Sequence, residues 1–251
     1  LGAIPLAKTE EYIQRVRQLL RGETVDWEFE SKSRKIRFLN PDLELINLED
    51  EIPLWFSGFG PKAKKLVADL NAGWLNFGAT GAEAALQEMQ AIWADGGRDP
   101  AALKSNLFFL GAVLTGDDTR DTEKLMAEAA PLTAVMFHNL ADEVGAMGGK
   151  NLPTGPLSNL VAEYLKVHDQ YAPSDAKYLS NHRGHLMFVR PDEKHLSPEL
   201  VRNTTMSGTI DELVETLSEL KRAGYNEVTI QLVHGHETAL EEWAEVFKRI
   251  Q

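Results

Sequence analysis

Residues 52–81 constrain the fold more than any other part of this chain of 251 residues. They combine a short apolar run at 53–56, a glycine-rich turn at 57–60, an amphipathic stretch from Pro61 and a second apolar run at 74–77. Short apolar runs are typical of strands buried on both faces, and proline suits the first position of a helix. The segment is therefore predicted to form a βαβ unit, with a turn between its first strand and its helix.

Glycines punctuate this unit at two places. Gly73 follows an apolar stripe at helical spacing, so the helix is predicted to end there. The turn at 57–60 lies directly before the helix, where free backbone amides attract anions and glycine lets a ligand come close. The pattern alone leaves two interpretations open, a phosphate site or simply a tight connection.

Three segments carry a resemblance to a known family. They are the βαβ run with its SGFGPKA turn, the sequence TEEYIQRVRQLLRG at 9–22, and the sequence SGTIDELVETLSELKRAGYNEVTIQ at 207–231. Their order and character resemble the luciferase-like family of flavin- and deazaflavin-dependent oxidoreductases. The resemblance implies an α/β fold, a TIM-type (β/α)8 barrel of the luciferase-like kind.

The remaining segments alternate between helical and strand patterns, as an α/β fold requires. Pro131 is expected to bend one long helix, Thr209 and Glu212 to form a capping box, and Gly224 to end the helix that follows it. Helices are expected at 9–21, 83–93, 122–144, 157–171 and 238–250, a hairpin or extended segment at 25–46, a polar loop at 178–198, and strands at 106–114 and 228–233.

Only four clear strands emerge, whereas a TIM-type barrel has eight. The resemblance places them as the fifth to eighth, in a single domain over 1–251 with a helical and loop insertion at 119–206 after the seventh strand. We therefore expect the C-terminal part of a longer polypeptide, or a chain that pairs with another copy or fragment. A naturally shortened family member is the alternative.

The resemblance also implies a cofactor, either FMN or the deazaflavin coenzyme F420. Carried over residue by residue, its phosphate-binding positions fall on the two small-residue turns of the βαβ unit. The expected cofactor-binding residues are Ser57, Gly58, Phe59, Gly60, Ala79 and Thr80. For Phe59, packing against the next strand is an equally good interpretation.

Histidines in the expected insertion are the candidates for proton transfer, because imidazole titrates near neutral pH. His182 and His185 are predicted catalytic residues, and Arg183 between them is predicted to bind an anionic substrate or cofactor tail. The alternative is that a polar loop carries them without a role. His138, within a helical pattern, is predicted to lie at the surface or the edge of the core.

A further histidine, His234, follows the last predicted strand and is expected near the substrate. It forms a His-x-His pair with His236, but this spacing offers no third ligand, so no metal site is predicted.

Composition narrows the class of partner. The net charge of −12 argues against nucleic acid, and no apolar run approaches the length of about 20 residues that a membrane-spanning helix needs. The chain has no cysteine, which excludes disulfides and a cysteine nucleophile. We expect a cytoplasmic protein that acts on a small-molecule substrate. The protein itself is expected to form a homo-oligomer or to associate with a missing N-terminal segment.

The resemblance implies an oxidoreductase, either a luciferase-like monooxygenase or a hydride-transferring reductase, acting on a small organic molecule. The alternative is a non-catalytic, truncated family member that binds flavin or forms oligomers.

Overall fold

The computed structural model describes residues 4–147 and 153–250. The chain divides into two compact units: the first holds the residues up to Leu75 with Met89–Lys104, and the second holds Asn76–Glu88 with the residues from Ser105 onward. The expected domain start at Leu1, and residues 148–152 of the expected insertion, lie outside the described residues. No helix in the described part of the chain is both long and apolar enough to cross a membrane.

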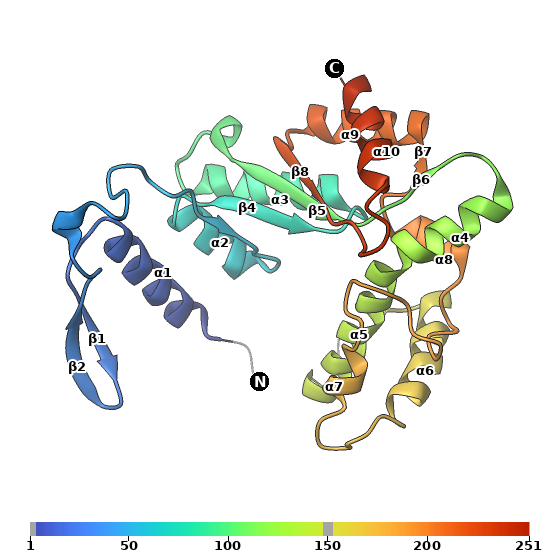
Figure 1. The fold of residues 1–251 in the computed structure, drawn as a ribbon, viewed down its shortest axis with the longest axis horizontal. Helices are drawn as coiled ribbons and strands as arrows, with labels where there is room; N and C mark the ends of the chain where they lie inside the picture. The colour runs from blue at the N-terminus through green and yellow to red at the C-terminus, as the bar shows by residue number, and fades with distance from the viewer. Residues whose placement is uncertain (1–3, 148–152, 251) are drawn as a thin grey trace. The chain divides into compact units, whose positions relative to one another are not determined.

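The first unit opens with a helix and an antiparallel hairpin (Figure 1). Its elements are α1 (Leu6–Leu20), β1 (Val25–Phe29), β2 (Lys32–Ile36) and the short 3-10 helix η1 (Pro41–Leu43). Val25 pairs with Ile36, and the turn residues Glu30 and Ser31 have φ angles of 51° and 58°. Two successive residues with positive φ are typical of a two-residue hairpin turn. The helix predicted at 9–21 and the hairpin predicted within 25–46 are both confirmed.

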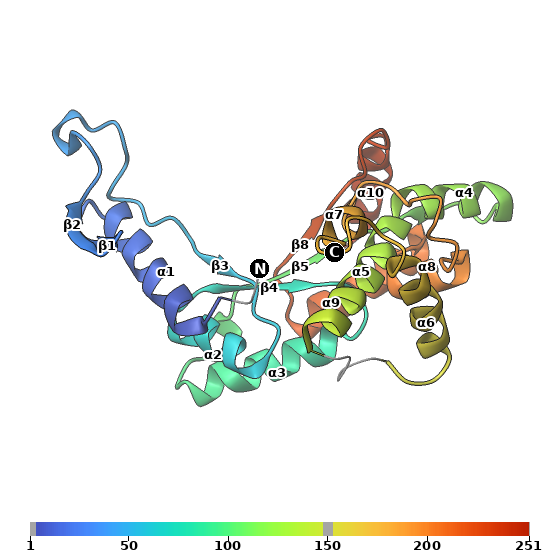
Figure 2. The same ribbon diagram turned by 90° about the horizontal axis from the view of Figure 1, so that it is seen from below.

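The predicted βαβ unit is also confirmed. Its elements are β3 (Trp55–Phe56), α2 (Pro61–Asp69) and β4 (Gly73–Phe77). β3 and β4 pair in parallel, and α2 lies on one face of them (Figure 2). Leu66 and Val67 of α2 are buried, as an apolar stripe that faces a sheet requires.

Gly73 has a different role from the predicted one. Helix α2 ends at Asp69, and Asn71 takes the left-handed conformation after it, with φ of 51°. Gly73 is instead the first residue of β4 and pairs with Trp55. A Cβ at Gly73 would lie 2.5 Å from the Trp55 ring, so glycine is needed here for close packing between strands.

The single strand predicted at 106–114 is wrong, because the chain is interrupted around Gly111. The elements are β5 (Ser105–Phe109), which pairs in parallel with β8 (Glu227–Ile230), and β6 (Val113–Leu114), which pairs in parallel with β7 (Gly208–Thr209). A Cβ at Gly111 would lie 1.7 Å from the carbonyl oxygen of Met206. This close backbone contact, which no sequence pattern reveals, separates the two strands.

The four predicted parallel strands belong to one sheet. Its order is β3-β4-β5-β8, and β4 runs from the first unit into the second. The order along the sheet follows the order along the chain, as it does for consecutive strands of a β/α barrel. An α/β fold with a parallel sheet is thus confirmed, and the place of these strands in a closed barrel stays a prediction.

The predicted helices are present, with one of them divided. They are α3 (Ala82–Asp95), η2 (Pro100–Ala102), α4 (Asp118–Glu128), α5 (Ala130–Met147), α6 (Pro156–His168), α7 (Tyr178–Asn181), α8 (Pro198–Thr204), α9 (Ile210–Ala223) and α10 (Ala239–Arg249). The long helix predicted around Pro131 consists of α4 and α5, which are separated by Ala129. Thr209 and Glu212 form the predicted capping box, and Gly224 ends α9 with φ of 117°.

Helices α5 and α6 pack side by side within the expected insertion (Figure 1). Phe137 of α5 and Tyr164 of α6 are buried and meet edge-on, with ring centroids 6.0 Å apart. Leu196 belongs to the same apolar cluster. The segment predicted as a polar loop at 178–198 is therefore anchored to a core and begins with the short helix α7.

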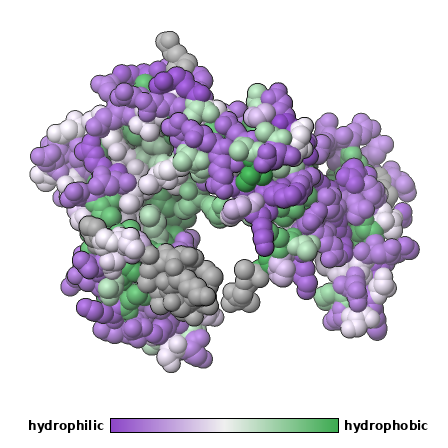
Figure 3. All heavy atoms as spheres, turned by 180° about the vertical axis from the view of Figure 1, so that it is seen from behind, coloured by the Kyte–Doolittle hydropathy of each residue, from purple (hydrophilic) through white to green (hydrophobic). Residues whose placement is uncertain are grey.

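Polar side chains cover most of the molecular face shown in Figure 3, and apolar side chains form smaller areas between them. Apolar residues are nevertheless exposed in the segment between η1 and β3 and just before it, where Leu39, Leu45 and Ile52 are 84%, 76% and 61% exposed. Single exposed apolar residues are common on protein surfaces and assign no function by themselves.

Candidate functional site

The turn at 57–60 connects β3 to α2 in the first unit. Gly60 is the N-cap of α2 with an extended backbone, and Pro61 occupies the first helical position. No side chain caps this helix end, so the first-turn amides of Lys62 and Ala63 have no side-chain acceptor. The positive end of the helix dipole is at the same place. This geometry suits an anion such as a phosphate group.

The individual residues of this turn differ in their access to a ligand. Gly58 is buried, its carbonyl accepts a hydrogen bond of 3.0 Å from Trp74 Nε1, and a Cβ on it would lie 2.9 Å from the backbone of Ala63. Close packing against the Ala63 backbone therefore requires a glycine at position 58. Phe59 is 63% exposed, so the interpretation that it packs against the next strand is wrong. Ser57 and Gly60 are exposed, and the cofactor role of all four residues stays a prediction.

The second small-residue turn, at 78–81, lies in the second unit. Gly78 and Gly81 have φ angles of 86° and 72°, a conformation that favours glycine. The Gly78 amide donates to the Phe108 carbonyl at 2.9 Å, so this glycine continues the pairing of strands. Thr80 is exposed and Ala79 half-buried. The turn leaves the Thr80 hydroxyl accessible, and its cofactor role stays a prediction.

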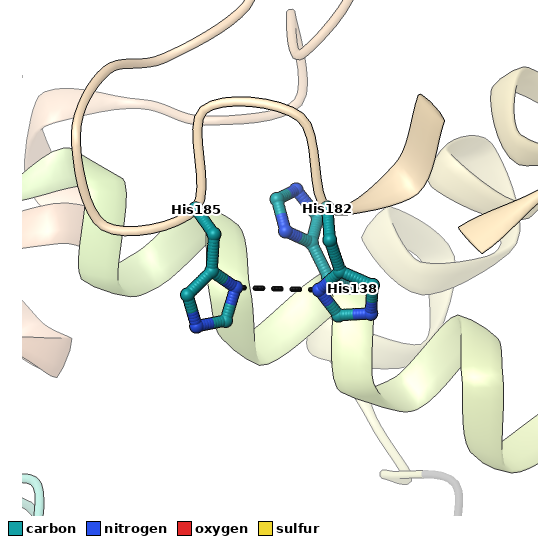
Figure 4. Close-up of side chains that lie close together, drawn as sticks. All are labelled: His138, His182 and His185. Atoms are coloured by element: carbon teal, nitrogen blue, oxygen red, sulfur yellow. Dashed lines mark hydrogen bonds between the residues drawn. The ribbon is translucent and has the colours of Figure 1, made fainter. Parts of the chain in front are cut away.

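Three histidines meet in the segment that was expected to be an insertion (Figure 4). His138 comes from α5, whereas His182 and His185 directly follow α7. The Nδ1 atoms of His182 and His185 are 3.2 Å apart, and one ring nitrogen from each of the three residues lies within 4.8 Å of the others. His138 is 2% exposed, so its predicted place at the surface or core edge is wrong.

Two carboxylates orient these rings. Asp142, one turn after His138 on α5, accepts from His182 Nε2 at 2.6 Å. Glu193 accepts from His138 Nε2 at 2.5 Å. Burial and the neighbouring imidazoles lower the pKa of His185. The structure thus brings the two predicted catalytic histidines together, and their role as a proton relay stays a prediction.

Arg183 and His234, the predicted substrate-binding residues, lie outside this group. Arg183 is exposed, and its carbonyl accepts from Arg190 Nη1 at 3.2 Å. The His234 side chain is 84% exposed and its Nδ1 lies 3.3 Å from Glu237. Among residues 4–147 and 153–250, the side chains of Arg183 and His234 form no hydrogen bond or ion pair with the three histidines, and their roles stay predictions.

The family can be assigned at this point. The model of the luciferase-like monooxygenase family matches residues 3–227. The chain belongs to that family. No curated protein matches the sequence of this luciferase-like protein closely enough to count as a relative.

Several solved structures have a fold similar to that of this chain. An F420-dependent secondary alcohol dehydrogenase in complex with an F420-acetone adduct matches with a TM-score of 0.59 and 15% identity over 100% of this chain and 64% of its own. The coenzyme F420 dependent tetrahydromethanopterin reductase from Methanopyrus kandleri matches with a TM-score of 0.57 and 15% identity over 100% and 65%. A riboflavin lyase with modified FMN and riboflavin matches with a TM-score of 0.54 and 13% identity, over 96% of this chain and 56% of its own. The luciferase-like chain thus spans less than two thirds of their lengths, and at such identities the likeness shows the fold alone.

Two residues of the segment at 119–206 were not predicted from the sequence. His138 has a signal in the sequence, because His138 and Asp142 form a polar pair one helical turn apart in a mostly apolar helix. Arg190 is 6% exposed, and its guanidinium contacts Glu193 at 3.0 Å. A loop pattern rich in charge gave no sign that this arginine is buried.

His195 is a partly buried titratable residue of the segment at 119–206. Its ring packs against those of Phe137 and Tyr164, with centroids 4.3 Å and 4.7 Å away, and its Nε2 is buried without a hydrogen-bond partner among the described residues. Burial lowers the pKa of His195 from 6.5 to about 4. The folded protein therefore holds this imidazole in its neutral form at neutral pH.

Stability of the luciferase-like protein is expected to fall between pH 6.5 and pH 4 in a way that depends on His195. In that window the unfolded chain binds a proton that the folded chain does not, so acid favours unfolding; above pH 6.5 the residue is neutral in both states. The thermal midpoint of the wild type should fall by a few degrees more than that of His195→Gln when both are compared at pH 7 and pH 4.5. Equal losses in the two proteins would contradict this prediction.

Proposed function

We propose that this protein is a flavin- or deazaflavin-dependent oxidoreductase that acts on a small organic substrate. Membership of the luciferase-like monooxygenase family and a parallel α/β sheet support the proposal. The similar structures also support it, because two of them are F420-dependent enzymes and one contains modified FMN. The uncapped N-terminus of α2 carries the most weight, because it offers the chemistry that a cofactor phosphate needs.

The residues of the turn fit a phosphate group, which both FMN and F420 carry. The amides of Lys62 and Ala63 would donate to its oxygens, and the exposed Ser57 hydroxyl lies in the same turn. A Cβ on Gly60 would meet no atom within 4 Å, so the space beside this residue is open. These residues would hold and orient the cofactor tail by hydrogen bonds and by the helix dipole.

The cofactor decides the type of reaction. When bound, reduced flavin supplies oxygen activation for a monooxygenase, and the deazaflavin supplies hydride transfer for a reductase. The contribution of the described residues is to bind the phosphate through the helix N-terminus, whichever of the two reactions the protein performs.

The variant Gly60→Asp is expected to weaken the binding of both FMN and F420 by at least about tenfold. A carboxylate at the N-cap would occupy the amides of Lys62 and Ala63 and repel the phosphate. Aspartate is a favoured N-cap residue and only slightly better than glycine there, so the free energy of unfolding should stay the same or rise by a few tenths of a kcal/mol, roughly 0.3 kcal/mol. Calorimetric titration with each cofactor, together with urea unfolding, measures both effects.

The matched control is Gly60→Ala, which adds an uncharged Cβ in open space. Its affinities for FMN and F420 should lie within about twofold of the wild-type values. If Gly60→Asp binds both cofactors as the wild type does, the turn does not hold the phosphate. If the wild type binds neither cofactor below about 1 mM, a binding free energy of about −4 kcal/mol, the oxidoreductase proposal is wrong. Binding without turnover of either reduced cofactor would favour the non-catalytic alternative.

A further inference from the structure

We propose that His138, His182 and His185 form a binding site for a divalent metal ion with the ligand preferences of zinc. One ring nitrogen from each residue lies within 4.8 Å of the others, and Figure 4 shows the imidazoles of His182 and His185 facing each other beside His138. A tetrahedral zinc ion with nitrogen ligands at about 2.0–2.1 Å holds them about 3.4 Å apart. His182 Nδ1 and His185 Nδ1 are already 3.2 Å apart, so small side-chain movements would complete the set.

The two carboxylates give His138 and His182 the tautomer that a metal requires. A carboxylate only accepts hydrogen bonds, so Asp142 places the ring hydrogen of His182 on Nε2, and Glu193 does the same for His138. Each ring therefore keeps a free lone pair on Nδ1. Histidine ligands of metals almost always donate their other N–H to a carboxylate, a carbonyl or water in this way.

An unpaired buried nitrogen points to a ligand independently of the clustering. His138 is 2% exposed, and its Nδ1 has no hydrogen-bond partner among the described residues. Leaving a buried acceptor unpaired costs free energy, and such groups are rare in folded proteins. A cation among the three rings would satisfy this atom.

The alternative is the proton relay predicted from the sequence, in which a proton is shared between His182 and His185. That role uses the 3.2 Å contact of their Nδ1 atoms and leaves His138 Nδ1 unpaired. A metal engages all three rings. The unpaired nitrogen of His138 therefore favours the metal over the relay.

The position of the three ligands predicts what the metal does to the fold. His138 lies in α5, whereas His182 and His185 lie after α7, so a bound ion would connect these two segments. His185 is exposed, which leaves the solvent side open for a water molecule as the fourth ligand. The metal site does not depend on the proposed oxidoreductase activity, because no cofactor residue takes part in it.

The test is zinc binding by the chelator-treated protein. Calorimetric titration with zinc sulfate at pH 7.5 should give one ion per chain with a Kd in the micromolar range or below. At a hundredfold excess over Kd the thermal midpoint should rise by about 5 °C or more. Cobalt(II) should bind to the same site and give the visible absorption of a four-coordinate ion.

Three variants make the test specific. His185→Gln changes an exposed residue and should weaken zinc binding at least about tenfold without loss of folding. Asp142→Asn should weaken it by about 10- to 100-fold through the orientation of His182. His234→Gln removes an imidazole that is 84% exposed and lies outside the group, so its zinc affinity should equal that of the wild type.

Absence of zinc and cobalt binding by the folded wild type would overturn the proposal. Equal zinc affinity of His185→Gln and the wild type would do the same, since the ion would then lie elsewhere. These results are independent of the cofactor titrations with the Gly60 variants, so either proposal can fail while the other stands.

Discussion

Replacing Arg190 with alanine is expected to destabilise the helical segment at 119–206 by about 3–5 kcal/mol. The side chains of Arg190 and Glu193 are 6% and 0% exposed, and Arg190 Nη2 lies 3.0 Å from Glu193 Oε1. Removing the guanidinium would leave a carboxylate buried without its main positive partner. The cost of such an unpaired charge is much larger than the net stabilisation from the intact pair.

The other contacts of Arg190 explain why no neighbour can replace it. Its Nη2 donates to the hydroxyls of Tyr171 at 2.6 Å and Tyr164 at 3.1 Å, and its Nη1 donates to the Asn181 carbonyl at 2.5 Å. One planar guanidinium thus joins α6 to the end of α7. Lysine has the charge but lacks the fork of donors, so Arg190→Lys should recover only part of the loss.

Urea unfolding followed by far-UV circular dichroism measures this effect. Arg202 provides the matched control, because it forms an ion pair with Glu212 in which the side chains are 48% and 54% exposed. Arg202→Ala should cost at most about 1 kcal/mol, as is typical of exposed pairs. Equal losses for the two arginine variants would show that burial does not make Arg190 special.

Gly111→Ala should destabilise the second unit by about 3 kcal/mol or more. Its Cβ would lie 1.7 Å from the carbonyl oxygen of Met206, a rigid backbone atom that cannot move away as a flexible side chain would. The Met206 amide donates to the Leu110 carbonyl at 3.1 Å, and the Gly208 amide donates to the Ala112 carbonyl at 3.2 Å. Separating the two segments to admit a methyl group would break both hydrogen bonds.

The pairing of β6 with β7 should be lost first, because it is shorter than the pairing of β5 with β8. Faster hydrogen exchange of the Gly208 amide would report this loss. Gly60→Ala is the matched control, because its Cβ meets no atom within 4 Å, and it should cost at most about 1 kcal/mol. A wild-type unfolding midpoint for Gly111→Ala would contradict the backbone contact.

Local signals predicted much of the fold. The βαβ unit, the hairpin, the capping box at Thr209 and Glu212, and the left-handed Gly224 each depend on neighbours within a few residues. Propensity, capping and turn preferences act at that range, so the sequence carries these elements directly. The predicted parallel sheet followed from the alternation of strands with helices.

Predictions that depended on distant residues were less successful. Gly73 was interpreted from its neighbours in sequence, and Gly111 was placed within one continuous strand, yet Trp55 and Met206 decide the roles of these glycines. His138 was expected at the surface or the edge of the core, and the segment around Arg190 was expected to be a polar loop, but both side chains are buried. Each of these depends on which segment packs against which.

The sequence by itself determined the family, the parallel α/β fold and the turn that precedes α2, because these follow from local patterns of apolar residues and glycines. Only the tertiary structure brought His138 of α5 to within 4.8 Å of His182 and His185, more than forty residues later in the chain, and buried its Nδ1 without a partner. This cluster of three histidines arises because α5 packs against the segment after α7. The local spacing of residues does not indicate which distant segments pack together.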